Sequence, residues 1–373
     1  MQNDKYYNNE EKKLKIISII KLYKKIIKSY YGNINFVIFR KPYEKKIFFY
    51  HNNSIPFSPK KNEKYFLIKS FDNTKTIKIN PNIIYCTNIP KNLPVVSKMG
   101  LKNDTIWNNN SFLLNEFYNK EKYKNLIKKA IGEIKKGTFQ KVVLSKYVKI
   151  PFHNISLEKT FQKLMISYPN ALISIWYDIH HGFWIGCTPE LLIKFQNKKL
   201  LISILAGTIW SDYAIWTSKE IKEHNIVVKY VEKILRSYNG FVTLKKTGIK
   251  RMGHLQHLET LISFSFLKTP NYNEVLNHIY PTPSICGFPK EQSFDFIKKN
   301  EGYKRNFYTG YIGIVNEKYM ELYLNLRCAR IKKEKKEITL YAGSGITIDS
   351  DIDQELIETE NKMKNILSQF IFK

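Results

Sequence analysis

Hydrophobic and polar residues alternate at two different spacings along this chain of 373 residues. Between residues 34 and 95, β-rich runs such as NINFVIFR and KKIFFYH are separated by Asn- and Pro-rich turns, which predicts short strands. Residues 1–30 and 115–137 instead carry apolar residues at helical spacing, so both are predicted to be amphipathic helices. Gly137 is expected to end the second of them.

From residue 139 onwards, strands and helices are predicted to follow one another closely. The predicted strands are FQKVVLSKYVKI, a hairpin from ALISIWYD to ELLIKF that turns at DIHHG, KLLISILAGT, and a hairpin from KYMELYLNLRCARI to EITLYAGSGI that turns at KKEKK. The predicted helices are LEKTFQKLMISYP, a long one in TSKEIKEHNIVVKYVEKILRSYN capped by Thr217 or Ser218, one ending at EVLNHI before a proline-rich loop, and SDIDQELIETENKMKNILSQF. Strands joined mostly by hairpins, with helices between them, indicate an α+β fold with antiparallel sheets.

The chain is strongly basic, with 61 Lys and Arg against 32 Asp and Glu and a net charge of +29. This charge alone would suggest a nucleic-acid-binding protein. Its lysines are scattered along the whole length, however, and Asn, Ile and Tyr are raised together with Lys, which is typical of drift towards A and T in codon usage. A nucleic-acid-binding protein usually clusters its charge and favours Arg, which is rare here. We therefore expect no nucleic-acid partner, although a basic surface would attract a small anionic substrate.

Cysteine spacing and the length of apolar runs bear on the compartment. The cysteines are far apart and form no C-x-x-C pair, so neither a zinc site nor a disulfide framework is indicated. No apolar run is long enough for a signal-peptide core or a membrane span. These features predict a cytoplasmic protein with reduced thiols and no membrane partner, and we expect a monomer.

Acidic residues are scarce overall, yet six of the twelve residues from Asp349 to Glu360 are acidic. Glu355 and Glu358 share a face of the predicted last helix, and Lys362 can pair with that face. A second pair with the same spacing, Glu220 and Glu223, lies on another predicted helix. Carboxylates brought together from two helices would suit Mg²⁺. The alternative is that these acids complement the positive end of the helix dipole, which explains Asp351 and Asp353 better than Glu358.

Four further positions are candidates for chemistry. The AGSG stretch at 342–345 is interpreted as a tight turn whose backbone N–H groups could hold a carboxylate. Arg327, on the predicted strand before it, could bind a carboxylate bidentately, or form a surface ion pair. Lys141 and Glu190 are each embedded among apolar residues. A Lys and a Glu in a partly dry site can have their pKa values driven together and serve as base and acid near neutral pH.

Nine sequence blocks then occur in a characteristic order. They are FQKVVLSK, TPELLI, LAGT, KEIKEHNIVV, QHLET, YPTPSICGFP, RNFYTGYIG, LRCARI and LYAGSGI with QELIETENKM. In this order and spacing the chain resembles the chorismate-utilising enzymes over about residues 115–370. Residues 111–373 would be the chorismate-binding catalytic region of one compact domain. Residues 1–110 match poorly and look like a shortened N-terminal part of the same fold.

The resemblance implies a fold, a metal and a set of roles. The fold would be two stacked antiparallel sheets flanked by helices around a deep cleft. Lys141 would be the base that activates water for attack at ring C2 of chorismate, and Glu190 the acid that protonates the departing C4 hydroxyl. Glu223 and Glu358 would ligate Mg²⁺, with Glu355 acting through water. The residues implied in substrate binding are Ala206, Gly207, Thr208, His257, Ser284, Ile285, Tyr308, Arg327, Tyr341, Gly343 and Lys362.

Two positions indicate a branch of the family. Lys141 in KVVLS is typical of members that use water, and Ala206 before Gly207 stands where an aminodeoxychorismate synthase often has a nucleophilic Lys. The resemblance therefore implies isochorismate formation. The shortened, drifted chain suggests an economical genome and so favours menaquinone synthesis, with a siderophore-pathway isochorismate synthase as an open alternative. Salicylate formation, which adds pyruvate elimination, is the close alternative, and a non-catalytic relic is a third. The chain departs from the family pattern at Tyr280 and Ser284 in YPTPS, at Ile221 and at Ile209.

Overall fold

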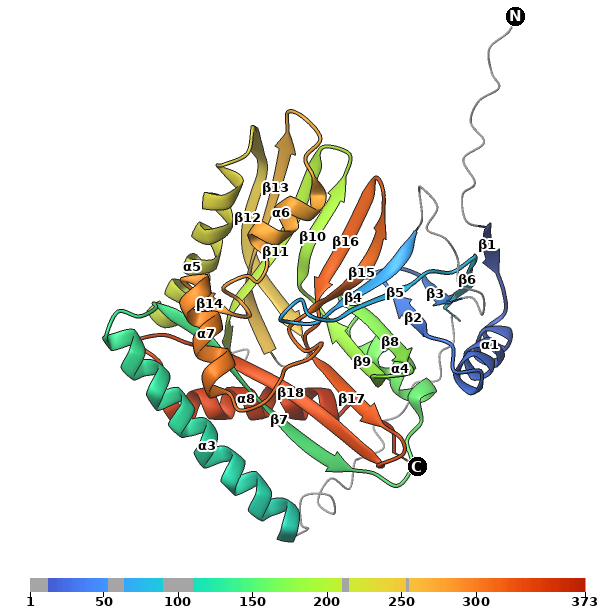
Figure 1. The fold of residues 1–373 in the computed structure, drawn as a ribbon, viewed down its shortest axis with the longest axis horizontal. Coiled ribbons are helices and arrows are strands. Elements are labelled where there is room, and N and C mark those ends of the chain that lie inside the picture. Colours follow the sequence, from blue (N-terminus) through green and yellow to red (C-terminus); the bar gives the residue numbers. More distant parts are fainter. Residues whose placement is uncertain (1–12, 53–63, 90–109, 210–214, 253–254, 373) are drawn as a thin grey trace, which may run out of the picture.

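Two large β-sheets organise the chain in a computed structural model that describes residues 13–52, 64–89, 110–209, 215–252 and 255–372 (Figure 1). The ten-stranded sheet has the order β1 (Lys13–Ile16), β6 (Ile83–Asn88), β3 (Lys46–His51), β2 (Phe36–Arg40), β8 (Leu172–Asp178), β9 (Gly182–Thr188), β17 (Cys328–Lys332), β18 (Glu337–Ile346), β7 (Lys141–Pro151) and β14 (Gly287–Phe288). The eight-stranded sheet has the order β12 (Gly240–Met252), β13 (Leu255–Phe266), β11 (Lys199–Ile209), β10 (Leu191–Gln196), β16 (Tyr319–Leu324), β15 (Tyr311–Asn316), β4 (Tyr65–Lys69) and β5 (Thr76–Ile79). Strand β1 pairs in parallel with β6, and the other pairings are antiparallel. The predicted α+β fold with stacked antiparallel sheets is confirmed.

Helices flank the two sheets. They are α1 (Ile19–Tyr31), α3 (Asn110–Lys135), α4 (Leu157–Ser167), α5 (Ser218–Leu235), α6 (Tyr272–Ile279), α7 (Lys290–Asn300) and α8 (Ile352–Leu367). Helix α5 packs against β11, α8 against β18 and α4 against β8. Among the described helices, none is both long and apolar enough to cross a membrane.

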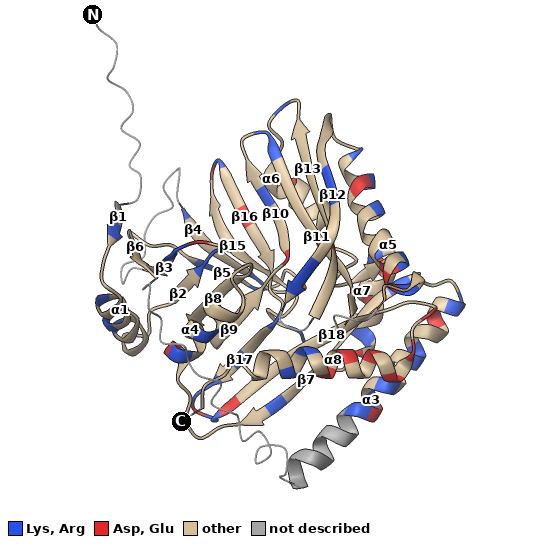
Figure 2. Cartoon of the chain, turned by 180° about the vertical axis from the view of Figure 1, so that it is seen from behind, with Lys and Arg blue, Asp and Glu red and all other residues tan. Residues whose placement is uncertain are grey.

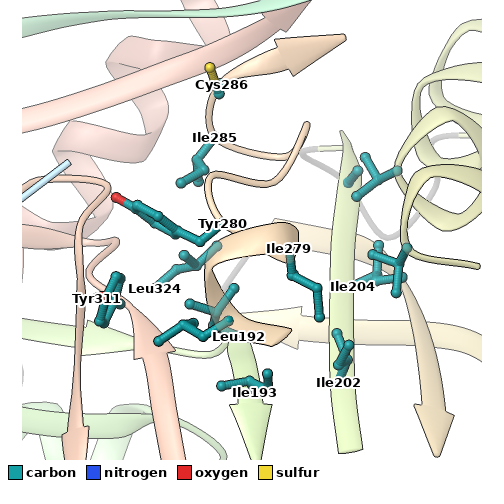
Figure 3. Close-up of a cluster of buried hydrophobic side chains, with 14 of the residues drawn as sticks. Leu192, Ile193, Ile202, Ile204, Ile279, Tyr280, Ile285, Cys286, Tyr311 and Leu324 are labelled. Atoms are coloured by element: carbon teal, nitrogen blue, oxygen red, sulfur yellow. The ribbon is translucent and has the colours of Figure 1, made fainter. Parts of the chain in front are cut away.

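Three hydrophobic clusters hold these layers together. One lies between the sheets and joins Phe39 and Trp176 of the ten-stranded sheet to Phe66 and Ile312 of the eight-stranded sheet. A second packs α1, α4 and α8 against the ten-stranded sheet. The third packs α5 and α6 against β10 and β11, where Ile202, Ile204 and Ile279 meet (Figure 3). Burial of alternate side chains on each strand therefore stacks the sheets and leaves their other faces to the helices.

Among the places where the chain passes from one sheet to the other, two are adjacent and are called here the two crossings. Strand β9 ends at Thr188 in the ten-stranded sheet, and β10 begins at Leu191 in the eight-stranded sheet. The second crossing runs from the end of β16 to the start of β17. Backbone hydrogen bonds tie the two crossings together, because the Leu324 N–H donates to the Glu190 carbonyl at 3.1 Å and the Cys187 N–H donates to the Arg327 carbonyl at 3.1 Å. Each crossing thus carries one residue singled out from the sequence, Glu190 or Arg327.

The local predictions are right for most elements and wrong in four places. The helix predicted over 1–30 starts only at Ile19, where Ser18 caps it, because residues 13–16 form β1; residues 1–12 lie outside the described residues. Each predicted hairpin strand that ends in ELLIKF or LNLRCARI is in fact two strands, because the chain changes sheets at the crossings. The prediction of a turn at AGSG is wrong, because residues 342–345 lie within β18 and pair with β7. Strands β12, β13, β14 and β15 and helix α7 have no counterpart in the sequence predictions.

Candidate functional site

A pocket opens beside the two crossings. It has about 740 Å³ of space free of protein atoms. Its lining includes every residue implied in substrate binding, namely Ala206, Gly207, Thr208, His257, Ser284, Ile285, Tyr308, Arg327, Tyr341, Gly343 and Lys362. Glu190, Glu223 and Glu358 also line it. The fold therefore brings segments more than 150 residues apart into one site, and the roles of these residues remain predictions.

Lys141 lies at the first position of β7 and is fully buried. Its ammonium nitrogen is 3.0 Å from Oε1 of Glu223 on α5, so the two charges are paired beneath the pocket. Burial alone would raise the pKa of Glu223, but the positive charges of Lys141 and Lys219 outweigh it and hold that pKa below its usual value. The pair thus keeps Glu223 ionised at neutral pH.

Gly345 makes room for this ion pair. A Cβ atom at this position would lie 2.1 Å from Oε1 of Glu223 and 3.0 Å from Cε of Lys141. Gly343 is also confined, since a Cβ there would lie 2.5 Å from the Leu144 carbonyl oxygen. The glycines of AGSG therefore serve close approach between β18 and its neighbours, rather than a turn.

Two further carboxylates face lysines, Glu358 in the pocket lining and Glu355 outside it. Glu355 of α8 is buried, lies 2.6 Å from the Lys219 ammonium and accepts a hydrogen bond from Ser350 Oγ at 2.7 Å. Burial, followed by the charge of Glu358, raises the pKa of Glu355 to about 6. Glu358 lies 2.5 Å from the Lys362 ammonium, which also donates to the Gly343 carbonyl at 2.9 Å. Each of the three acids therefore has its own lysine.

These acids match a divalent cation in the kind of donor they supply. Carboxylate oxygens are what Mg²⁺ prefers, and Oε2 of Glu355 is buried without a hydrogen-bond partner. Glu223 and Glu358 both act on the pKa of Glu355 through their charge, so the three groups lie within electrostatic reach of one another. Within the described ranges, no three His, Cys, Asp or Glu side chains are close enough to hold one ion together. The lysines neutralise the cluster in this arrangement.

The other acids of the two clusters have structural roles. Glu220 belongs to a capping box at the start of α5, where its Oε2 accepts from the Thr217 N–H at 3.0 Å. Asp351 caps α8 by accepting from the Gln354 N–H at 2.9 Å, and Asp353 pairs with Lys124 at 2.7 Å. The helix-start interpretation is thus right for Asp351. Figure 2 shows acidic positions along α8 and basic positions spread over many elements, in line with a scattered positive charge.

Glu190 sits on the first crossing with its carboxyl group in the pocket lining. Oε1 accepts a hydrogen bond from Ser284 Oγ at 2.9 Å, and Ser284 Oγ is 2.7 Å from Thr282 Oγ1. Burial raises the pKa of Glu190 to about 7, although the Ser284 hydrogen bond opposes the rise. A carboxyl group with this pKa can give up a proton near neutral pH.

Arg327 heads a chain of hydrogen bonds along the pocket wall. Its Nη2 lies 3.0 Å from Nε2 of His257, whose Nδ1 lies 3.1 Å from Thr208 Oγ1. A guanidinium can only donate, so Nε2 accepts and the imidazole is neutral. Burial and the Arg327 charge accordingly hold the pKa of His257 well below its usual value. In the described part of the chain Arg327 thus bonds to a neutral histidine and not to a carboxylate. The alternative prediction, that Arg327 forms a surface ion pair, is therefore wrong.

A buried pair behind the pocket has no counterpart in the sequence predictions. Arg305 Nε donates to Glu301 Oε2 at 2.8 Å, Nη2 donates to the Val143 carbonyl at 2.7 Å and Nη1 to the Ile285 carbonyl at 2.8 Å. Glu301 also accepts from the Ser145 N–H at 2.8 Å. The pair therefore joins β7 to the loop that carries Ser284. Its only signal in the sequence is the i, i+4 spacing of an acid and one of the few arginines.

Comparison with known proteins agrees with this geometry. The family profile described as chorismate binding enzyme matches residues 85–371. The chain is 28% identical over 274 residues to the vibriobactin-specific isochorismate synthase of Vibrio cholerae, a match that covers 66% of each chain. It is 26% identical over 264 residues to anthranilate synthase component 1 of Saccharolobus solfataricus, covering 67% of this chain and 62% of that one. DhbC from Bacillus anthracis has the same fold, with a TM-score of 0.73 at 21% identity over 93% of this chain and 99% of the other.

The two sheets, the pocket and the family profile agree on one class of protein. The chain belongs to the chorismate binding enzymes. The chain matches about two thirds of the length of the Vibrio relative and somewhat less of the Saccharolobus one.

Substitution of Gly345 tests the crowding at the ion pair. In Gly345→Ala the new methyl group must push Glu223 away from Lys141, and a misplacement of about 1 Å can cost roughly 10²-fold in rate. We expect the enzymatic rate to fall by about that factor while the circular dichroism spectrum stays unchanged. Gly132→Ala is the matched control, because no atom lies within 4 Å of the added Cβ. Equal activity in the two variants would contradict the crowding argument.

Proposed function

We propose that the chain is an isochorismate synthase, which converts chorismate to isochorismate by adding water at ring C2 and releasing the C4 hydroxyl. The observation that carries this proposal is the placement of two proton-transfer candidates near one pocket. Glu190, whose carboxyl has a pKa of about 7, lines the pocket, and the buried Lys141, which is not in the lining, acts on that carboxyl through its charge. They come from different elements, β7 and the β9–β10 crossing. The names of relatives such as the Vibrio enzyme point the same way.

In the proposed reaction the two groups move protons on one ring. The Lys141 ammonium that pairs with Glu223 would first give its proton to solvent. The neutral Lys141 amine then takes a proton from water as the water oxygen bonds to C2, and Glu190 gives a proton to the C4 oxygen as the C4–O bond breaks. The ring double bonds shift between the two carbons, so no redox partner is needed. Ala206, beside Gly207, offers no amine for attack at C2, which supports water as the nucleophile.

The substrate's two carboxylates need separate partners. We assign the enolpyruvyl carboxylate to Arg327, Tyr308 and the backbone near Gly343, all of which line the pocket. Because His257 is neutral, the Arg327 charge is free to act on that carboxylate. We assign the ring carboxylate to Mg²⁺ held by Glu223 and Glu358, with Glu355 acting through water. The ion would neutralise the ring carboxylate of the substrate. It would also supply the acids with the positive charge that Lys219 and Lys362 supply in this structure.

Two finer assignments follow the sequence analysis. Salicylate formation is the second candidate, since it uses the same first step and then eliminates pyruvate. For the destination of isochorismate we propose menaquinone synthesis, because the drift in composition is typical of a reduced genome. A cytosolic, monomeric enzyme suits a small soluble substrate.

Product analysis tests the proposed reaction. Incubated with chorismate and Mg²⁺, the protein should yield isochorismate, with little aminated product when ammonia is supplied. Lys141→Ala should lower kcat by about 10²–10⁴-fold, the usual contribution of a general base, while chorismate still binds. Salicylate plus pyruvate would favour the second candidate. Anthranilate or aminodeoxychorismate as the main product, or Lys141→Ala at more than about a tenth of wild-type kcat, would overturn the water-using reaction.

The pKa of Glu190 predicts how the rate depends on pH. Glu190 must be protonated to act as an acid, so kcat/KM should be full below its pKa of about 7 and fall as the pH rises through that value. The negative charge of bound chorismate should raise this pKa further, so kcat should fall at a higher pH than kcat/KM. Rate measurements from pH 5 to 9 follow this alkaline fall in kcat/KM and in kcat. A kcat/KM that is flat or rising between about pH 6 and 8.5 would contradict the assignment.

The metal assignment predicts a graded loss. Excess chelator should abolish activity, and added Mg²⁺ should restore it. Glu358→Gln removes one carboxylate charge and should raise the Mg²⁺ concentration for half-maximal rate by about tenfold or more, within the range of effects seen when metal-site groups are changed. Asp353→Asn, on the same helix but paired with Lys124 on its surface, is the control and should respond to Mg²⁺ like the wild type. Full activity in chelator would exclude this assignment.

A further inference from the structure

Lys250 differs from its neighbours on β12. Residues 241–249 of this edge strand are exposed, whereas the Lys250 side chain is only 17% exposed and turns inward. Its Nζ donates to the Pro189 carbonyl at 2.9 Å and to Glu259 Oε1 at 2.7 Å. Removing a lysine ammonium from solvent costs free energy, so contacts inside the protein must offset this cost.

Glu259 holds this lysine in place from the neighbouring strand. It lies on β13 opposite Leu205 of β11, and its Oε1 also accepts from Ser203 Oγ at 2.6 Å. One carboxylate oxygen therefore receives both a hydroxyl and an ammonium donor. This arrangement restricts the Lys250 ammonium to one direction, towards the first crossing between the sheets.

Pro189 is the residue that this ammonium reaches, and Glu190 follows it directly. Proline has no backbone N–H, so its carbonyl is the group through which the backbone here can be tied by a hydrogen bond. The Glu190 carbonyl is held by the Leu324 N–H, and its carboxyl group by Ser284. Lys250 thus holds the crossing at Pro189, on the N-terminal side of Glu190. The charge of Lys250 also acts on the Glu190 carboxyl.

We propose that Lys250, held by Glu259, is a positioning residue that anchors the Pro189 carbonyl and thereby directs the Glu190 carboxyl into the pocket. The proposal rests on the proposed function, in which Glu190 is the proton donor. The charged and polar groups acting on the Glu190 carboxyl are Lys141 from β7, the Leu205 backbone N–H from β11, Lys250 from β12 and Ser284, which is bonded to Thr282, from the loop after α6, while His257 and Arg327 line the same pocket. Of these, Lys250 alone acts through the backbone beside Glu190.

The first test compares pH profiles. Lys250→Gln removes a positive charge near Glu190, so the alkaline limb of kcat/KM should move up by about 0.5–1 pH unit, less than the 1–3 units of a direct ion pair. The kcat should fall about tenfold with KM for chorismate within about threefold, because the group acts on catalysis and not on substrate binding. Lys250→Arg should restore the alkaline limb. Lys246→Gln, an exposed lysine on the same strand, should behave like the wild type.

A second variant gives a shift of opposite sign. Glu259→Gln keeps an oxygen that accepts from Lys250 but removes the charge that offsets it, so the alkaline limb should move down. This variant carries the test if Lys250→Gln does not fold. Unchanged limbs in both variants, or equal losses in Lys250→Gln and Lys250→Arg at an unchanged pH profile, would reduce Lys250 to a structural role and overturn the proposal.

A titration without turnover separates this proposal from the proposed function. In protein labelled with carboxyl-¹³C glutamate, the Glu190 resonance is assigned by its absence from Glu190→Gln, and its titration is followed in the wild type and both variants. If the wild type makes no isochorismate, the proposed function fails, yet the upward shift in Lys250→Gln still supports the contact with Glu190. If isochorismate forms but neither substitution changes the titration of Glu190, the positioning role of Lys250 is rejected and the proposed function stands.

Discussion

A fully buried ammonium group governs the arrangement around the pocket. Lys141 has no exposed surface, and a charge so placed is tolerated only beside an opposite charge. Glu223 supplies that charge from α5, so its side chain must reach the start of β7, and β18 must have no side chain at Gly345, where a Cβ would collide with Glu223. The glycine at position 345 and the positions of Glu223 on α5 and Lys141 on β7 all follow from the need to form this one ion pair. Loss of either partner would leave an uncompensated buried charge, which typically costs about 3–5 kcal/mol.

The two crossings place a carboxyl group, Glu190, and a guanidinium group, Arg327, at the same pocket. Stacked sheets normally bury apolar side chains between them, as Trp176 and Phe66 do here. Where β9 passes into β10 and β16 into β17, the backbone leaves both sheets, and polar side chains can point into the space between them. Arg327 takes a left-handed conformation, with φ of 49°, to make the second of these turns. The site is therefore located where the regular packing of the two sheets is interrupted.

The sequence was a good guide to whatever depends on neighbours along the chain. Thr217 caps α5 and Asp351 caps α8 because a cap is decided within four residues. The pocket residues were found through the order of sequence blocks, which carries information on tertiary structure that spacing alone lacks. Periodicity failed at LNLRCARI, because a strand that changes sheets keeps its alternation up to Leu324 and gives no sign of the break. The inward turn of Lys250 could not be predicted either, since one more lysine in so basic a chain carries no signal.

The charges of the pocket indicate what a substrate would still require. Among the described residues, Lys141 and Lys362 each lie against one glutamate and Lys219 lies against two. Lys250 lies against Glu259. Arg327 bonds to a neutral histidine, so its charge is the one not already matched by a carboxylate in these pairs. Chorismate carries two carboxylates, and Arg327 can neutralise one of them. The second needs either a lysine released from its glutamate or an added cation, and releasing a lysine would expose a buried acid whose neighbours are also acids. A divalent ion satisfies the acids and the substrate together, which is the physical reason for proposing Mg²⁺ in a protein with so many lysines.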